Sequence, residues 1–367
     1  MFIECSLTTL KATAKMSNSV TLRDVAQLAG VSIGTASQAL NNRPNVAPET
    51  RSRVVDAAMS LGYPLKESDS ESQSPLEVIG LLVKHDFDLP PEVNPFYAYI
   101  QAGVERACQS LNLSLMYANI EVDPSNHPVG WPAMIREQRI DGLILAGTFI
   151  EETIDSFKRH IEAPIVLVDS YAPNLPFDSI VIDNIPGAYV AVKYLIESGH
   201  RHIGLIGAND HSPPSVLERR AGYVNALRDR HIHDVYIEPS RLDRESGYAA
   251  TQKLLQKAPQ VTAIFACNDF SAIGVMHAAR EMGLRVPEDL SVVGFDNIDV
   301  AKEVTPPLTT VHVHKTWMGI LGVRQLLERA QNPEQPKVTV VVSTQLIARN
   351  SVNREAKCES ALGPSIC

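Results

Sequence analysis

The chain contains 367 residues, of which 44% are apolar and 20% charged, and its formal net charge is −9. This length exceeds one ordinary hydrophobic core and predicts two or three domains. No apolar run approaches the roughly 18 residues of a membrane-spanning helix, so the composition is that of a soluble globular protein. The acidic balance excludes a chain that binds polyanions over its whole surface, but it allows a small basic module because charge acts locally.

Five cysteines are spread along the chain, and none forms a C-x-x-C pair. The odd count argues against a disulfide framework, and the spacing argues against a structural zinc site. Residues 1–16 have neither helical periodicity nor the continuous apolar core of a secretion signal. We therefore expect a cytoplasmic protein in which 1–16 is a dispensable extension.

Residues 17–64 carry the signals of three short helices in close succession. Good N-cap residues precede the first two, a glycine ends the first, and a proline opens the third. The predicted helices cover 22–29, 33–41 and 48–61. Small apolar residues form one seam between the first two helices, which a tight turn joins, as in a helix-turn-helix. The alternative is an unrelated three-helix bundle without a ligand.

Residues 65–77 are polar and acidic and separate the helical module from the rest of the chain. The serines of this segment favour coil, and Pro75 would block a helix that continued through it. We therefore predict a flexible acidic linker over 65–77.

From residue 78 onward, short apolar runs of strand length alternate with segments of helix length. Strands are expected at 78–83, 113–117, 142–145, 165–168, 203–206, 263–266 and 291–295. Continuous apolar strands separated by amphipathic helices predict parallel sheets covered on both faces, and this many units predicts two doubly wound sheets. Polar residues follow three strands, where ligands of such sheets bind: Asp169, the pair Asn268 and Asp269, and Asp296. They predict a polar cleft, and the alternative for each is a helix cap.

Two groups of motifs resemble one family of regulators, the lactose-repressor/galactose-repressor (LacI/GalR) family. The segments 20–32, 46–51 and 61–63, with Thr35 and Asn41 between them, resemble its DNA-binding domain. Five further segments resemble the effector domain of the family: 203–207, 218–223, 267–269, 286–296 and 307–311. The resemblance runs with ordered spacing from about residue 18 to 352.

The resemblance implies a homodimeric transcriptional repressor, not an enzyme, that binds a palindromic double-stranded DNA operator. It implies an α/β core of the periplasmic-binding-protein type, with a small-molecule effector, expected to be a carbohydrate, between two subdomains and with no cofactor or metal. The chain would cross between the subdomains near 182, 311 and 342. The effector and dimerisation domain would then span 78–352, with an N-subdomain of about 78–182 and 312–341 and a C-subdomain of about 183–311 and 342–352.

The second predicted helix carries the residues expected to contact bases. Its first residues Ser32, Ile33 and Gly34, and Gln38 one turn later, would face the major groove. Gln38 can read adenine through paired hydrogen bonds, whereas Ile33 offers only apolar contact. The expected phosphate contacts are Thr21, Thr35, Asn41, Asn45 and Arg51. For Arg51 the alternative is a solvated helix face.

Charge supports this assignment weakly, because five basic residues stand against three acidic ones over 17–66. In the family, the segment after the third helix commonly folds on DNA into a hinge helix with a leucine that wedges into the minor groove. This chain has no leucine between Leu65 and Leu76, so we expect no such wedge. The segment 353–367 lacks a leucine heptad, so we predict a disordered tail and a dimer rather than a tetramer.

The resemblance places the effector site at Asp169, Arg219, Asn268 and Asp296. Carboxylates accept hydrogen bonds from hydroxyl groups, and arginine offers a fixed fork of donors, as recognition of a polyol requires. Arg219 has an alternative role as the ion-pair partner of Glu218 or of another neighbour. Two contact positions depart from residue types found in the family, Val313 and Lys315, and Leu242 lies near where some members stack an aromatic residue on the ligand. These positions leave open a ligand other than a plain hexose.

Two other classes of protein share such a core. A solute-binding protein of transport would carry a secretion signal and no helix-turn-helix. An enzyme would need a nucleophile or cofactor motif, and the sequence contains no G-x-S-x-G, P-loop or complete G-x-G-x-x-G. The histidine pairs at 231 and 233 and at 312 and 314 lack a third ligand, which argues against a metal site.

Overall fold

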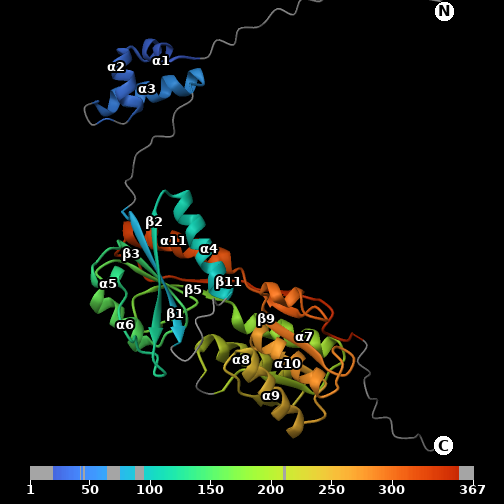
Figure 1. Cartoon of the computed structure of the whole chain (residues 1–367). Coiled ribbons are helices and arrows are strands. Elements are labelled where there is room, and N and C mark those ends of the chain that lie inside the picture. Colours follow the sequence, from blue (N-terminus) through green and yellow to red (C-terminus); the bar gives the residue numbers. More distant parts are fainter. Residues whose placement is uncertain are drawn as a thin grey trace, which may run out of the picture. The chain divides into compact units, whose positions relative to one another are not determined.

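The computed structural model describes residues 20–41, 43, 46–63, 75–86, 95–209 and 212–354 (Figure 1). The chain divides into two compact units between Ser74 and Pro75. Within the described ranges, no helix is long and apolar enough to cross a membrane. The expected extension over 1–16, most of the linker over 65–77 and most of the tail over 353–367 lie outside the described residues.

The first unit contains three helices, α1 (Leu22–Ala29), α2 (Ile33–Leu40) and α3 (Pro48–Leu61). Helix α1 ends at Gly30, whose φ of 66° lies in the left-handed region that glycine adopts without strain. Helix α3 packs against both shorter helices. Their shared core consists of Val25, Ala26, Ala29, Ala36, Ala39, Val46, Val54, Ala57 and Ala58. The predicted helix-turn-helix is confirmed, with α2 ending one residue earlier than expected.

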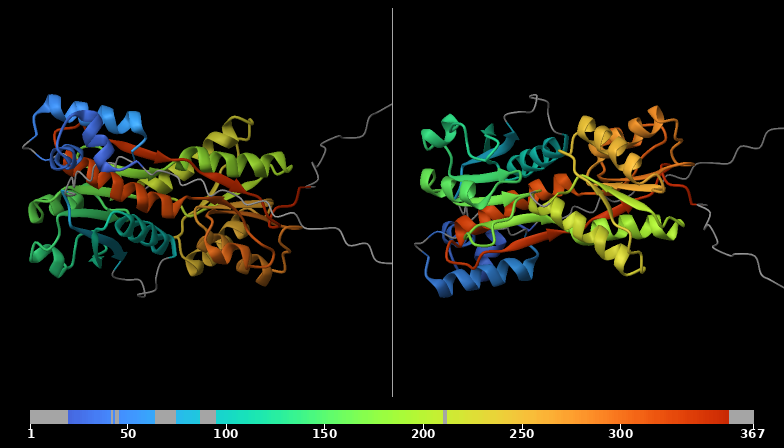
Figure 2. Two further views of the ribbon diagram at one scale, coloured as in Figure 1. Left: turned by 90° about the horizontal axis from the view of Figure 1, so that it is seen from above. Right: turned by 90° about the horizontal axis from the view of Figure 1, so that it is seen from below.

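The second unit contains two six-stranded sheets, each with helices on both faces (Figures 1 and 2). The first sheet has the order β11-β5-β4-β3-β1-β2 and is parallel throughout its paired strands. Its strands are β1 (Val78–Asp86), β2 (Ser114–Val122), β3 (Gly142–Ala146), β4 (Ile165–Val168), β5 (Asp178–Ile182) and β11 (Thr339–Val342). Helices α4 (Pro95–Ser110) and α11 (Lys315–Gln331) cover one face, and α5 (Ala133–Arg136) and α6 (Glu151–His160) cover the other. We call this half the N-subdomain.

The second sheet has the order β12-β10-β9-β8-β6-β7, and we call this half the C-subdomain. Its strands are β6 (Ile203–Ile206), β7 (Tyr236–Glu238), β8 (Ala263–Ala266), β9 (Ser291–Asp296), β10 (Thr309–His312) and β12 (Gln345–Ile347). Helices α7 (Asn184–Glu197) and α8 (Pro214–Arg228) cover one face, and α9 (Arg244–Lys257) and α10 (Asp269–Glu281) cover the other. A short 3-10 helix, η1 (Asp299–Lys302), follows β9. The predicted doubly wound parallel sheets are confirmed, and among the described strand pairs only β10 and β12, at one edge, are antiparallel.

Three passages of the chain join the two subdomains. They lie between β5 and α7, between β10 and α11, and between β11 and β12. Because parallel strands align their carboxyl ends, the residues that follow β4, β5, β8 and β9 collect at sheet edges, where ligands of such sheets bind. This topology brings the candidate effector residues together.

Candidate DNA-binding surface and effector site

The exposed side of α2 carries the residues predicted to contact bases. Ile33, Gly34 and Gln38 are all exposed, and Ile33 leaves 44% of its surface accessible. Burying a side chain of this kind contributes about 2 kcal/mol, so contact of Ile33 with a partner surface would be favourable. Ser32 instead caps the N-terminus of α2. Its Oγ accepts a hydrogen bond from the Thr35 amide at 3.0 Å and lies 2.8 Å from the Thr35 Oγ1.

The residues predicted to contact phosphates are partly used by the module itself. The Thr21 hydroxyl and amide both donate to the Asp24 carboxylate, at 2.7 and 2.8 Å, and these bonds hold the pKa of Asp24 below its usual value. Asn41 donates from Nδ2 to the Ser37 carbonyl at 2.8 Å. Arg51 donates to a loop carbonyl, that of residue 43, at 2.6 Å, and is half-buried rather than the solvated side chain considered from sequence. The remaining candidate, Asn45, lies outside the described residues.

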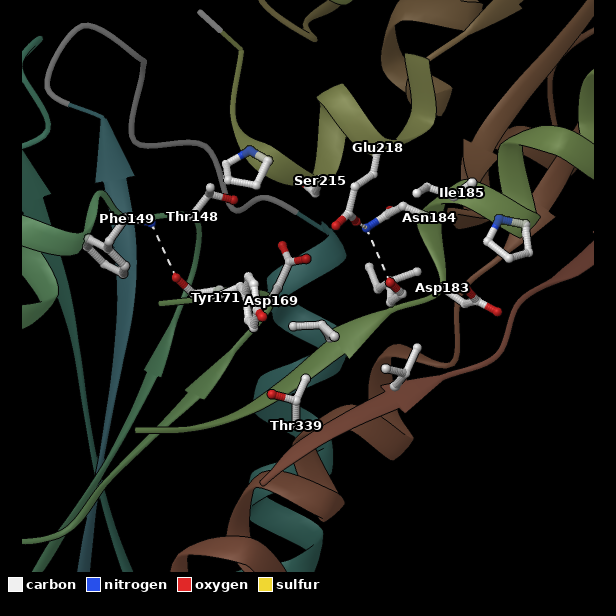
Figure 3. Close-up of a pocket in the computed structure, with 16 residues that line it drawn as sticks. Thr148, Phe149, Asp169, Tyr171, Asp183, Asn184, Ile185, Ser215, Glu218 and Thr339 are labelled. Carbon is white, nitrogen blue, oxygen red and sulfur yellow. Dashed lines mark hydrogen bonds between the residues drawn. The ribbon is translucent and has the colours of Figure 1, made fainter. Parts of the chain in front are cut away.

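A cavity of about 480 Å³ lies between the two subdomains (Figure 3). Its polar lining comes from both halves and from the passage between them: Thr148, Asp169, Ser170, Tyr171 and Thr339 from the N-subdomain, Asp183 from the passage after β5, and Asn184, Ser215 and Glu218 from the C-subdomain. Figure 3 shows the carboxyl groups of Asp169 and Glu218 directed toward one another across this space. The passage from β5 to α7 also lines it, so a bound molecule would touch a connection between the subdomains. We call this space the effector cavity.

Asp169 is the predicted effector residue that lines the effector cavity. Tyr97 of α4 donates from its hydroxyl to the Asp169 Oδ2 at 3.0 Å. Asp169 follows β4 and Asp296 is the last residue of β9, and their φ values of 57° and 104° are ones that residues with a side chain rarely adopt. Such backbone strain concentrates at ligand sites, because the surrounding fold must hold it in place.

Arg219 lies beside the effector cavity but is 5% exposed and bonded within the protein. Its Nε donates to the Asn184 Oδ1 at 2.9 Å, and its Nη1 donates to the Cys267 carbonyl at 2.6 Å. The guanidinium stacks on Phe295 at 3.9 Å and lies 3.4 Å from the Asp296 Oδ1. The sequence left open a role for Arg219 as an ion-pair partner of Glu218 or of another neighbour. In the structure, the partner of Arg219 is Asp296.

Asn268 caps a helix, which was the alternative to a direct effector contact at this position. Its Oδ1 accepts the Ser271 amide at 2.9 Å at the start of α10, and its Nδ2 donates to the Leu242 carbonyl at 2.7 Å. Asn268 therefore fixes the end of β8 against the loop before α9. Its side chain is 9% exposed and does not line the effector cavity.

Buried acids dominate the electrostatics of this region. Burial raises the pKa of Asp169 to about 6, although the charge of Arg219 and the hydrogen bond from Tyr97 oppose the rise. Burial, together with the charge of Asp296, raises the pKa of Asp269 to about 8. Burial also raises the pKa of Asp296, whose Oδ1 accepts no hydrogen bond from the part of the chain that the structure describes.

Four residues of this region were not predicted as site residues. Asn184 lies two residues after the end of β5, so the rule that selected Asp169 near a strand end could have found it. Lys315 was noted from the sequence only as a departure from the residue types of the family. Its Nζ donates to the carbonyls of Asp296 and Asn297 at 2.5 and 3.3 Å. Tyr97 and Glu218 lie inside helices, and no local signal marks either one.

Comparison with known proteins identifies the family. Residues 21–64 match the model for bacterial regulatory proteins of the lacI family, and 192–352 match the periplasmic binding protein-like domain. The ribose operon repressor of Haemophilus influenzae is 34% identical over 336 residues, which cover 90% of this chain and 98% of that protein. The HTH-type transcriptional repressor PurR of Mannheimia succiniciproducens is 32% identical over 344 residues, 92% of this chain and 99% of that one. This chain belongs to the lacI family.

Solved structures of the family share its fold. The transcriptional regulator CelR in complex with cellobiose has a TM-score of 0.64 and 29% identity, and the match covers 90% of this chain and 99% of that one. A lac repressor dimer bound to operator and an anti-inducer has a TM-score of 0.63 and 25% identity over 91% and 99% of the two chains. The lacI-family chain described here is accordingly a DNA-binding transcriptional regulator under small-molecule control, and not an enzyme.

Proposed function

We propose that this regulator is a cytoplasmic homodimeric repressor of a palindromic operator and that a sugar or sugar derivative in the effector cavity controls its affinity for DNA. The observation that carries the effector class is the lining of the cavity. Carboxylate, carboxamide and hydroxyl groups from both subdomains face one space of about 480 Å³. Hydroxyl groups of a carbohydrate can donate to such carboxylates and accept from the amide and hydroxyl donors.

The position of the effector cavity between the subdomains explains how a ligand would change the affinity for DNA. A ligand changes DNA affinity only if it binds one arrangement of the subdomains better than another. Asp169 lies in the N-subdomain and Glu218 in the C-subdomain, so a ligand held by both residues favours the arrangement that brings them together. The passage between β5 and α7 lies in the same wall and would transmit that preference.

The names of some similar proteins support this effector class, although other relatives carry the name PurR. One relative is a ribose operon repressor, and solved structures of the family hold cellobiose or ribose. The residues proposed for DNA are Ile33, Gly34 and Gln38 for bases, with Thr21, Ser32, Thr35, Asn41, Asn45 and Arg51 supporting the backbone contacts. Asp169 is proposed to touch the effector, and Arg219, Asn268 and Asp296 to support the pocket around it.

A gel-shift assay tests both halves of the proposal. The full chain is mixed with DNA that flanks its own gene, with and without a panel of neutral pentoses, hexoses and their amino and phosphate derivatives. We expect a specific complex at nanomolar protein and a change in its dissociation constant of at least fivefold with one sugar. Failure to bind the flanking DNA or any palindrome selected from a random library would contradict the operator proposal. Binding of DNA without a response to any sugar would contradict the effector class alone.

A further inference from the structure

Two carboxyl groups that line the effector cavity, those of Asp169 and Glu218, each keep an oxygen open for a ligand. Among the described residues, the Asp169 Oδ2 accepts from Tyr97, and the Glu218 Oε2 accepts from the Asn184 Nδ2 at 2.9 Å. The second oxygen of each carboxyl group receives no hydrogen bond from that part of the chain. Close by, the buried Oδ1 of Asp296, a residue 8% exposed, is likewise without a hydrogen-bond donor among the described residues.

The two buried cations of the region do not supply the missing donors to the cavity. Arg219 directs its Nε and Nη1 at the Asn184 side chain and the Cys267 carbonyl. Lys315 bonds to two main-chain carbonyls, and its Nζ lies 5.6 Å from the centre of the Tyr99 ring. Neither cation lines the effector cavity, whereas both Asp169 and Glu218 do.

The two facing carboxyl groups belong to opposite subdomains. Asp169 follows β4 of the N-subdomain, and Glu218 lies on α8 of the C-subdomain. Like charges that face each other across a partly buried space repel, and this repulsion grows as the space closes. Burial is the main cause of the raised pKa of Asp169, and the charges of Asp296 and Glu218 add to the rise. A ligand that closes this cavity must therefore bring positive charge or leave the repulsion in place.

We propose that the effector is an amino sugar whose ammonium group lies between Asp169 and Glu218. This inference rests on the proposed carbohydrate effector and narrows its class. An ammonium group offers three donors and no acceptor, which matches open carboxylate oxygens on two sides. A neutral hydroxyl group offers one donor and leaves the two charges uncompensated. A phosphate or carboxylate group adds a third negative charge, so phosphorylated sugars are rejected.

Calorimetric titration of the full chain with matched sugar sets tests the charge preference. Each set contains a neutral hexose, its 2-amino-2-deoxy derivative and its phosphate: glucose, galactose and mannose provide three such sets. In at least one set we expect the amino sugar to bind at least tenfold more tightly than the neutral sugar, with no measurable binding of the phosphate. A neutral sugar that binds as tightly as its amino derivative, or more tightly, overturns the amino-sugar inference and leaves the carbohydrate effector standing. If no member of any set binds, the amino-sugar inference fails, and the gel-shift panel, which includes pentoses, decides separately whether the effector is a carbohydrate.

Charge-neutral variants test the position of the ammonium group. Glu218→Gln and Asp169→Asn, each checked for folding by its melting curve, should reduce the preference for the amino sugar to less than threefold. Glu245→Gln, at an exposed position on α9, is the matched control and should keep the full preference. Two independent variants are used so that loss of folding in one leaves the other to decide. A preference that persists in both folded variants would place the ammonium group elsewhere and overturn the assignment.

Discussion

Arg219 illustrates how one side chain can look like a ligand contact in sequence and a structural partner in the fold. From the resemblance, Arg219→Ala is expected to abolish the effector response and to leave DNA binding intact. The structure shows that the guanidinium is buried with Asn184, Cys267 and Asp296 around it. Its removal leaves a buried carboxylate without its cation, so we expect Arg219→Ala to lower the free energy of unfolding by about 3–5 kcal/mol. Urea denaturation measures this loss.

Exposed Arg280 on α10 provides the control for that experiment, since Arg280→Ala should change the free energy of unfolding by less than about 0.5 kcal/mol. If Arg219→Ala proves as stable as the parent chain and loses only the effector response, Arg219 acts as a direct ligand contact and its buried bonds contribute little to stability.

Asp269 gives the core a specific dependence on pH. Its carboxyl group is fully buried, accepts hydrogen bonds from the Thr310 hydroxyl and the Ile298 amide at 2.5 and 2.8 Å, and has its pKa raised to about 8. The folded chain therefore holds a proton that the unfolded chain has released above its own, lower pKa. The resulting stability is lost as pH rises through the folded pKa. We expect the free energy of unfolding to fall by about 1 kcal/mol per pH unit between pH 6 and 8.

Denaturation curves at pH 6, 7 and 8 provide the measurement, and Asp269→Asn should flatten most of this slope because it removes the titrating group. A parent chain whose stability stays level or rises across this range would contradict the assignment to Asp269.

At the scale of elements, one buried ion pair and its neighbouring hydrogen bond join β5, α11 and the segment before β11. Asp178 begins β5 and is fully buried; it accepts from the Arg329 Nε and Nη2, both at 2.8 Å, and from the Val338 amide at 2.7 Å. Arg329 lies near the end of α11, and Val338 precedes β11. Burial alone would raise the pKa of Asp178, but the bonds from Arg329, Val338 and Gln325 outweigh it and lower the pKa. We expect Asp178→Ala to cost about 3–5 kcal/mol of unfolding free energy.

The exposed pair of Asp155 and Arg159, 2.8 Å apart on α6, is the matched comparison. Asp155→Ala should cost less than about 1 kcal/mol, because solvent screens the charges and the side chains lose freedom when paired. Equal losses in the two variants, measured by chemical denaturation, would show that Asp178 does not fasten the three elements.

Helix α2 should read the operator through few side chains. Gln38 is exposed one turn after Gly34, and a bidentate contact to adenine contributes about 1–3 kcal/mol of discrimination. We expect Gln38→Ala to reduce the preference for one base pair in each half-site about tenfold or more, as measured by gel shift with single-base operator variants. Gln27→Ala, at an exposed position of α1, should leave all preferences unchanged. A uniform loss of affinity for every sequence would instead assign Gln38 to the DNA backbone.

At the scale of the whole molecule, the linker sequence bears on how the two half-sites are read. Residues 65–77 contain Glu67, Asp69 and Glu71, which phosphates would repel, and there is no leucine between Leu65 and Leu76 to wedge between base pairs. We expect changes of the central base pairs to alter the dissociation constant for the operator less than threefold. The effector would then act on DNA binding through the spacing of the two half-sites. Gel shifts with altered central steps and fixed half-sites test this. A strong preference for a flexible pyrimidine–purine step, with a bend on binding, would show that a wedge forms.

The sequence by itself determined the local structure and the family. Helices α1 and α3 begin and end where their caps, proline and glycines predicted, and β4, β6 and β8 coincide with their apolar runs, because caps and continuous apolar runs are signals confined to a few neighbouring residues. Strands β1 and β2 extend farther than expected, to Asp86 and Val122, because pairing with each other continues the ladder beyond the apolar run.

Only the tertiary structure decided which polar residues face the effector cavity. Sequence placed Asp169 and Arg219 in one site, but Arg219 meets Asn184 and Cys267, which are 35 and 48 residues away along the chain, and is buried by them. Glu218, its neighbour in the sequence, lines the cavity instead. Adjacent residues of a helix point in directions about 100° apart, so the packing of α8 against the sheet determines which of the two is buried. The antiparallel edge strand β12 arises in the same way, because pairing with β10 is a long-range contact that no local pattern specifies.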